Sequence, residues 1–220
     1  MLKKTSFDFL TSLAKNNERD WFNQHRNDYE QTMDDFTGFI QELIAEIGKF
    51  DKSIAQSGLF AKDCIPRLNR DLRFAKDKSP YKTYLYAIIN NGGRKSGQAG
   101  YFVVLNPGEC YIGGGAFQPD PLKLKKIRQE IDFDFKEWKK IAEDQKLLEF
   151  FPEGITAQDY LQKVPKGFDP DSAAKEYLKM KGFFVRKYYA DSFFTVKSNF
   201  EKIVESFKVC QSLNQYINSI

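Results

Sequence analysis

Two short runs of aromatic and β-branched residues in the middle of the chain constrain its fold more than any other feature. Residues 84–90 and 100–105 have the composition of strands, and the Gly-rich stretch 92–97 between them is typical of a flexible hairpin loop. Asn106-Pro107-Gly108 then turns the chain into a third run at 109–113. A parallel pairing needs a longer crossover than these connections supply. The sequence therefore predicts an antiparallel β-meander in which consecutive strands pair.

Helical periodicity is found on both sides of the predicted meander. A capping-box pattern at Thr5 and Asp8 begins a first predicted helix, which ends near Asn17. Asn17 can in turn cap a second helix that continues to Gly48. Asp120-Pro121 combines an N-cap residue with a proline at the first helical position. The other predicted elements are an edge strand at 64–69, a strand at 183–189, and helices at 134–141, 172–181 and 191–217.

Helices around a central antiparallel sheet indicate the α+β class, and the composition suits a globular chain. With 220 residues, 41% hydrophobic and 29% charged, and no repeat or linker, we expect a single domain over residues 1–220. No run is long enough for a transmembrane helix, and the N-terminus lacks the apolar core of a signal peptide. We therefore expect a cytoplasmic protein with no membrane partner.

The cysteine and histidine content excludes several kinds of site. Cys64, Cys110 and Cys210 are odd in number and form no CxxC pair, so we expect reduced, mostly buried thiols. His25 is the only histidine, which excludes sites built from several histidines. We therefore expect no metal and no cofactor.

The excess positive charge of the chain lies in one segment, residues 67–82. This segment has six Lys and Arg side chains against two Asp, so its net charge of +4 equals that of the whole chain. Arginine offers a planar fork of donors to phosphate or carboxylate, and the turn sequence Asp77-Lys78-Ser79-Pro80 favours a loop able to wrap a ligand. The candidate ligand-binding residues are Arg67, Arg70, Arg73, Lys76, Lys78, Tyr81 and Lys82.

An alternative interpretation makes segment 67–82 an internal hub of ion pairs, because structural networks also gather charge in this way. The cations would then be neutralised by Asp71 and Asp77, joined by acids elsewhere such as Glu18 and Asp20. The two interpretations differ in whether the cations are already paired when no ligand is bound.

Three other motifs allow a functional and a structural interpretation. Gly113-Gly114-Gly115 lacks the spacing of a phosphate-binding loop, so we interpret it as a strand end or bulge where backbones approach closely. Residues 165–168 could clamp an anion through Lys166, but we interpret them as an ordered turn anchored by Phe168. Five residues within two and a half helical turns could form one pocket wall with His25 as a proton shuttle, or His25 could simply pack there. These five are Trp21, Phe22, His25, Arg26 and Tyr29.

Several of these motifs together resemble one known family. Asn16-Asn17-x-Arg19-x-Trp21-Phe22 looks like the opening of the bacterial domain of unknown function 2461 family. Arg70-Asp71-x-Arg73-Phe74-x-Lys76-Asp77-Lys78-Ser79-Pro80-Tyr81-Lys82 resembles the most distinctive segment of that family. Further matching motifs follow in the expected order: Gly113-Gly114-Gly115, Pro119, Arg128 and Pro165-Lys166-Gly167-Phe168. The resemblance implies a single-domain bacterial protein of the cytoplasm, and it implies no activity.

Three hypotheses for the function follow. In the first, a cationic pocket binds a phosphate- or carboxylate-bearing small molecule. In the second, the cations contact a nucleic acid together with the aromatic residues between and after them, although the isoelectric point of 8.7 lies below the range typical of such domains. These aromatic residues are Phe74, Tyr81, Tyr84 and Tyr86. In the third, the protein is an interaction module whose basic segment is a salt-bridge hub. Catalysis is not assigned, since His25 or a nearby carboxylate would be the only kind of base available.

Overall fold

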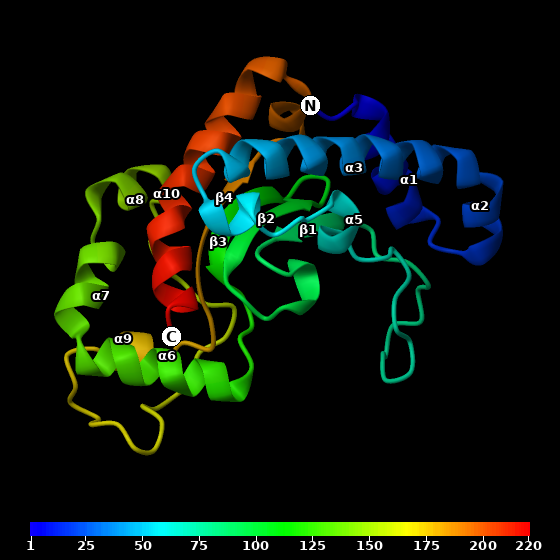
Figure 1. Ribbon diagram of the computed structural model, residues 1–220. Coiled ribbons are helices and arrows are strands. Elements are labelled where there is room, and N and C mark those ends of the chain that lie inside the picture. Colours follow the sequence, from blue (N-terminus) through cyan, green and yellow to red (C-terminus); the bar gives the residue numbers. More distant parts are fainter. The chain divides into compact units, whose positions relative to one another are not determined.

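The computed structural model describes residues 1–220, which form an α+β protein with one antiparallel sheet (Figure 1). The sheet order is β1-β2-β3-β4, the same as the order along the chain. The predicted meander is therefore confirmed, and a long helical insertion separates its third strand from the fourth. The strands are β1 (Leu85–Ile89), β2 (Gly100–Leu105), β3 (Cys110–Ala116) and β4 (Phe183–Tyr189).

Helices precede, interrupt and follow the sheet. Those before it are α1 (Lys4–Lys15), α2 (Arg19–Gln24), α3 (Arg26–Gly48), α4 (Lys52–Ala55) and α5 (Ala61–Cys64). Those between β3 and β4 are α6 (Pro121–Phe133), α7 (Phe135–Ala142), α8 (Gln145–Phe150) and α9 (Lys175–Leu178). The 3-10 turns are η1 (Gly93–Lys95), η2 (Asp191–Thr195) and η3 (Lys197–Asn199), and the chain ends with α10 (Phe200–Asn218).

The chain divides into two compact units, and each is described separately below. Unit 1 comprises Met1–Arg94, Phe102–Ile112 and Tyr188–Val204, and unit 2 comprises Lys95–Tyr101, Gly113–Lys187 and Glu205–Ile220. The expectation of a single domain stays a prediction. None of the helices has the length and apolar character needed to cross a membrane.

The predicted second helix is in fact two helices, because the chain breaks at His25 between α2 and α3. Asn17 does not cap α2, since the residue before that helix is Glu18. The Asn17 side chain instead binds the backbone of Tyr81, donating from Nδ2 to its carbonyl at 2.9 Å and accepting from its amide at 3.1 Å. An asparagine amide can satisfy both groups of a peptide at once, and this tertiary contact competes successfully with local capping.

The predicted edge strand at 64–69 is wrong, and so is most of the predicted helix at 172–181, which shortens to α9. Cys64 ends the short helix α5, and the chain then enters an irregular loop. Its only ladder-like pairing is one antiparallel bridge, Asn69 to Tyr81. The stretch buries Cys64, Ile65 and Leu68 and has only one charged residue, but Pro66 has no N–H to donate to a ladder, so the pairing does not extend.

Close packing explains the glycine run in β3. A Cβ on Gly114 would lie 2.5 Å from the Cβ of Cys210, and one on Gly115 would lie 2.3 Å from the carbonyl oxygen of Phe183. Gly115 also has a φ of 128°, in the region that favours glycine. The interpretation as a close approach of backbones is therefore confirmed at Gly115, whereas Gly114 lies against the side chain of Cys210. The thiols of Cys64, Cys110 and Cys210 are all free and buried.

Candidate functional site

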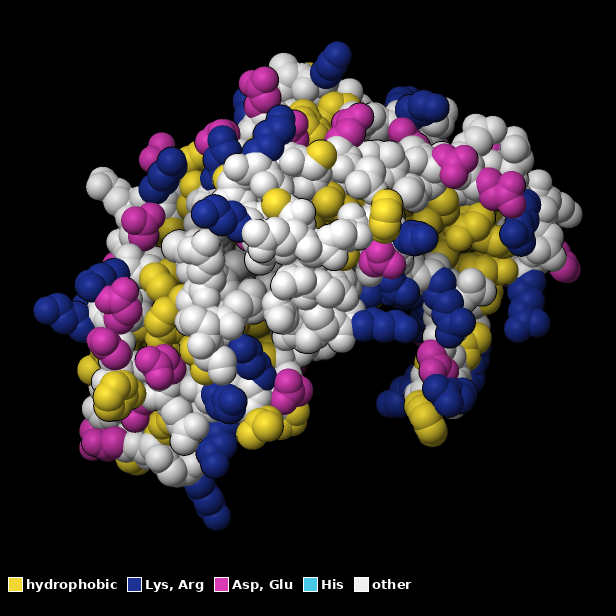
Figure 2. Space-filling view, viewed as in Figure 1, with side chains coloured by type: hydrophobic (Ala, Val, Ile, Leu, Met, Phe, Trp, Pro, Cys, Tyr) yellow, Lys and Arg dark blue, Asp and Glu magenta, His cyan; other side chains and the backbone are white.

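Residues 67–82, called the basic loop from here on, project from the helices of unit 1 as an open excursion of the chain (Figure 1). Figure 2 shows Lys and Arg side chains gathered over this projection, with a few acidic groups among them. Two backbone bonds close its base, from the Arg70 amide to the Pro80 carbonyl and from the Lys82 amide to the Leu68 carbonyl, both at 2.9 Å. The base is therefore held like a short hairpin, and the side chains decide what the loop can bind.

Arg73 has its donor fork fully occupied. Its Nε donates to Oδ1 of Asp71 at 3.0 Å, and its Nη2 donates to Oδ2 of the same carboxylate at 2.6 Å. These hydrogen bonds, helped by the nearby charge of Arg67, lower the pKa of Asp71. The Arg73 side chain is 78% exposed. Asp71 thus occupies the Nε and Nη2 side of Arg73 and neutralises its charge, while the Nη1 donors of Arg73 have no partner.

Arg70 is bound along only one part of its guanidinium. Its Nη1 donates to Oδ2 of Asp77 and, at 3.2 Å, to the Ser79 carbonyl. No partner contacts its Nε or Nη2, so the side fork of this guanidinium is open. The side chain is 28% exposed. Arg70 is therefore held in place by Nη1 while it keeps the donor pair that recognises phosphate or carboxylate.

Asp77 orients Arg70 and is itself held by Ser79. Its Oδ1 accepts from the Ser79 amide at 2.9 Å and from the Ser79 hydroxyl at 2.7 Å. These bonds, followed by the bond from Arg70, lower the pKa of Asp77. The two acids of the basic loop thus pair with two of its three arginines, Arg70 and Arg73, whereas Glu18 and Asp20 form no ion pair with it.

Lys82 is a cation without a carboxylate partner. Its Nζ donates to the carbonyls of Arg67 at 2.8 Å and Asn69 at 3.1 Å. Burial lowers the pKa of Lys82, and the positive charges of Arg67 and Arg70 lower it further. Three cations therefore lie close together at the base of the loop, and Lys82 is repelled by the other two.

A pocket of about 480 Å³ opens at this base, and we call it the Arg70 pocket. Of the seven residues predicted from the sequence, Arg70, Tyr81 and Lys82 line it, whereas Arg67, Arg73, Lys76 and Lys78 do not. The remaining lining residues are Ala14, Asn17, Asp71, Asp77, Ser79, Thr83 and Tyr84. The predicted binding role of all seven residues stays a prediction.

Tyr81 is a wall of the Arg70 pocket that is anchored from behind. Its ring stacks on Phe22 with centroids 4.0 Å apart, and the residue is only 8% exposed. Asn17 holds its backbone, as described above. Sequence reasoning missed the role of Asn17, because a residue that can cap a helix gives no signal of a contact 64 positions away.

The five residues of the predicted pocket wall around His25 divide into two groups. Trp21 and His25 stack with ring centroids 4.0 Å apart and line a second pocket, of about 410 Å³. Phe22 instead contacts Tyr29 and Tyr81, and Arg26 pairs with Glu30 on its own helix. The predicted wall is thus formed by Trp21 and His25, and the second pocket is named the Trp21 pocket.

Comparison with known proteins gives one match. A family model described as "Conserved hypothetical protein (DUF2461)" matches residues 5–216, which includes every motif on which the resemblance rested. No curated protein and no solved structure matches the chain.

Proposed function

This chain belongs to the DUF2461 family of conserved hypothetical proteins, and since that description names no activity, we propose a function from the Arg70 pocket itself. The proposal is that this cytoplasmic protein binds a small molecule through a phosphate or carboxylate group of that ligand. Arg70 and Lys82 are the principal ligands, Arg67 adds charge, and Tyr81 forms a wall.

The open fork of Arg70 is the observation that carries this proposal. A guanidinium that already shares its fork with a carboxylate, as Arg73 does, gains little by exchanging one anion for another. Arg70 is oriented through Nη1 and has its Nε and Nη2 donors unused, so an anion can bind without breaking its pair with Asp77. The arginine is pre-organised, which reduces the entropy lost on binding.

Lys82 supports the same site through its charge. An ammonium group has three N–H donors, and carbonyls occupy two of those on Lys82. The third donor is available, and the neighbouring guanidinium groups make the free protein locally too positive. An anion in the pocket would relieve that repulsion, and its binding would raise the pKa of Lys82 back toward the ordinary value.

A matched pair of variants tests this proposal. Arg70→Gln and Arg73→Gln remove the same charge from the same loop, but only Arg70 lines the pocket. Isothermal titration with inorganic phosphate and with citrate should show a loss of affinity of about 10- to 100-fold in Arg70→Gln, the range for a bidentate charged hydrogen bond. Arg73→Gln should lose no more than about twofold, which is a long-range charge effect.

Two results would contradict the proposal. If both variants lose affinity equally, the loop attracts anions only by its net charge. If neither anion binds the unmodified protein, the pairs of Arg70 and Arg73 are a structural hub, as in the third hypothesis. Circular dichroism of each variant shows whether the fold is retained, so that loss of binding is separated from unfolding.

A second candidate function, binding of single-stranded nucleic acid, is favoured by one observation. Phe74 is 95% exposed within the basic loop, next to Arg73 and Lys76, and an exposed ring among cations can stack on a base. The affinity for a labelled oligonucleotide, measured by fluorescence anisotropy, should then be about tenfold lower in Phe74→Ala. Phe133→Ala is the matched control, because Phe133 is 88% exposed on α6, outside the basic loop. Equal effects in both variants, or no binding, exclude this candidate.

A further inference from the structure

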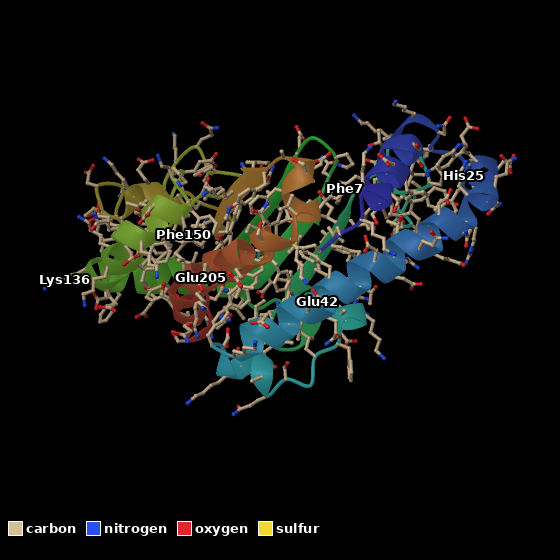
Figure 3. The ribbon with its side chains drawn as sticks, turned by 90° about the horizontal axis from the view of Figure 1, so that it is seen from above. Phe7, His25, Glu42, Lys136, Phe150 and Glu205 are labelled. Atoms are coloured by element: carbon tan, nitrogen blue, oxygen red, sulfur yellow. The ribbon has the colours of Figure 1, made fainter.

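The Trp21 pocket lies among the three N-terminal helices and has chemistry opposite to that of the Arg70 pocket. His25 marks the junction of α2 and α3 beside the pocket (Figure 3). No Lys or Arg side chain lines it. The lining residues that matter for its chemistry are Asp8, Trp21, His25, Asp28 and Thr32.

Two carboxylates face this pocket without partners. Asp8 comes from α1 and Asp28 from the first turn of α3, and neither makes a hydrogen bond or an ion pair. The nearby cation Arg26 is committed to Glu30, at 2.9 Å. The pocket is therefore lined by two exposed negative charges without an ion-pair partner, and it favours a positively charged ligand.

The hydrogen-bonding state of His25 follows from its partner. Its Nδ1 lies 2.8 Å from the carbonyl oxygen of Trp21, which can only accept, so Nδ1 carries the proton. The other ring nitrogen, Nε2, has no partner and in the neutral ring is an acceptor. His25 thus adds an acceptor to those of the two carboxylates.

Thr32 provides an observation that is independent of charge. It lines the Trp21 pocket and is only 3% exposed, yet its hydroxyl makes no hydrogen bond. The hydroxyl oxygen is not one of the fully buried polar atoms without a partner, so it opens to the pocket, where a donor can reach it. A polar group that reaches this pocket from an otherwise buried position indicates that the pocket receives a polar ligand.

We propose that the Trp21 pocket binds an organic cation with N–H donors, a primary ammonium or a guanidinium group. Asp8 and Asp28 balance its charge, and the Nε2 of His25 and the hydroxyl of Thr32 accept further N–H bonds. The Trp21 ring contacts the cation or its alkyl part. No group of three or more His, Cys, Asp or Glu side chains in the structure could hold a metal ion, so a cation with its own donors fits better. This inference goes beyond the proposed anion site, with which it shares no lining residue.

The test uses three small cations and no unknown ligand. Isothermal titration with 1,4-diaminobutane and with methylguanidinium should give saturable binding. Tetramethylammonium has the same charge as methylguanidinium and no N–H donor, so we expect it to bind at least about tenfold more weakly. Equal affinity for all three would contradict the proposal, because it would indicate attraction by charge alone. Absence of saturable binding for both N–H cations would overturn it directly.

Matched variants then locate the site. Asp28→Asn and Asp34→Asn remove the same charge from α3, but only Asp28 lines the pocket. Asp28→Asn should lower the affinity for 1,4-diaminobutane about tenfold, and Asp34→Asn should lower it no more than about twofold. Thr32→Val, which keeps the shape and removes the hydroxyl, should weaken binding severalfold.

Equal losses in Asp28→Asn and Asp34→Asn, or full binding by Asp28→Asn, would refute the site. If Asp28→Asn is unfolded by circular dichroism, Asp8→Asn provides the same test from α1. Phosphate binding should be unchanged in these variants, so failure of this inference is distinguishable from failure of the proposed anion site.

Discussion

The basic loop and the glycine-rich end of β3 hold their conformations in opposite ways. In the loop, exposed ion pairs and side chain to backbone hydrogen bonds fix a chain that has almost no core, as in the pair of Arg73 with Asp71. In β3, Gly114 and Gly115 are fixed by steric fit, because no room remains for a Cβ. Water can replace the polar partners that hold the loop. Water cannot relieve the steric clash that a Cβ would create in β3.

This difference separates what the fold requires from what the loop can offer a ligand. Exposed ion pairs contribute little to the free energy of unfolding, whereas a clash with the backbone of a neighbouring strand costs much more. The concentration of charge in residues 67–82 is therefore not explained by stability. Our proposal attributes this charge to binding, with Arg70 held ready and Arg73 neutralised by Asp71. The predictions below test this separation, from the largest expected effect to the smallest.

Gly115→Ala should have the largest effect. A Cβ at this position would lie 2.3 Å from the carbonyl oxygen of Phe183 and 2.5 Å from Cα of Phe184, and φ is 128°. We expect a loss of at least about 3 kcal/mol in the free energy of unfolding, measured with urea. Gly38→Ala in α3 is the control, because no atom lies within 4 Å of a Cβ built there. This change should raise the free energy of unfolding by about 0.5–1 kcal/mol. Similar effects of the two changes would contradict the steric account of β3.

Trp138→Ala and Phe74→Ala each remove a large ring, the first from the buried core and the second from the exposed basic loop. Trp138 is fully buried and makes edge contacts with Tyr177 and Phe183, at centroid distances of 5.4 and 5.6 Å. Its truncation should cost about 3–5 kcal/mol. Phe74 is 95% exposed, so its truncation should change the free energy of unfolding by no more than about 0.5 kcal/mol. A large loss in Phe74→Ala would show that the loop packs on the fold, against the present account.

The pH dependence of the loop should be the smallest effect. Hydrogen bonds from Arg73 lower the pKa of Asp71, and those from Ser79 and Arg70 lower that of Asp77. The unfolded chain therefore takes up protons first as the pH falls, and the stabilisation is present above about pH 4 and lost below it.

This pH dependence is checked by comparing the thermal unfolding of the double variant Asp71→Asn/Asp77→Asn with that of the unmodified protein. The small difference in Tm at pH 7 should shrink as the pH falls through the lowered pKa values of the two acids, and salt should reduce it. A difference that stays constant or grows in acid would mean that these carboxylates are not paired in solution.

Much of the fold could be predicted because its signals are local. The strands at 100–105 and 183–189 have the predicted bounds, since aromatic and β-branched runs between turn residues specify them without long-range information. The break at His25 and the loss of the 64–69 strand could not be predicted in this way. At the break, the His25 ring nitrogen Nδ1 bonds the carbonyl of Trp21, and in the second stretch the pairing is confined to one bridge, Asn69 to Tyr81.

The sequence is enough to locate the candidate site, but it does not identify which of its arginines has donors free for a ligand. Charge counting finds residues 67–82, because the excess is confined to them. It cannot say which arginine is available, since Asp71 lies two residues from Arg73 and Asp77 lies seven from Arg70. Only the fold shows that Asp71 occupies the Nε and Nη2 donors of Arg73, whereas Asp77 binds Nη1 of Arg70 and leaves its Nε and Nη2 donors open. Trp21 and His25 indicate a pocket wall from the sequence, but the hydroxyl of Thr32, which opens to the Trp21 pocket, has no signal there.

The most direct test of the central claim is an NMR titration of the arginine Nε–H signals with inorganic phosphate. If the open fork binds the anion, the Nε–H resonance of Arg70 should shift in a saturable manner, because its donor gains a partner. The Nε–H resonance of Arg73, already bonded to Asp71 at 3.0 Å, should barely move. A saturable shift of Arg73 with no shift of Arg70, or no shift of either, would contradict the account.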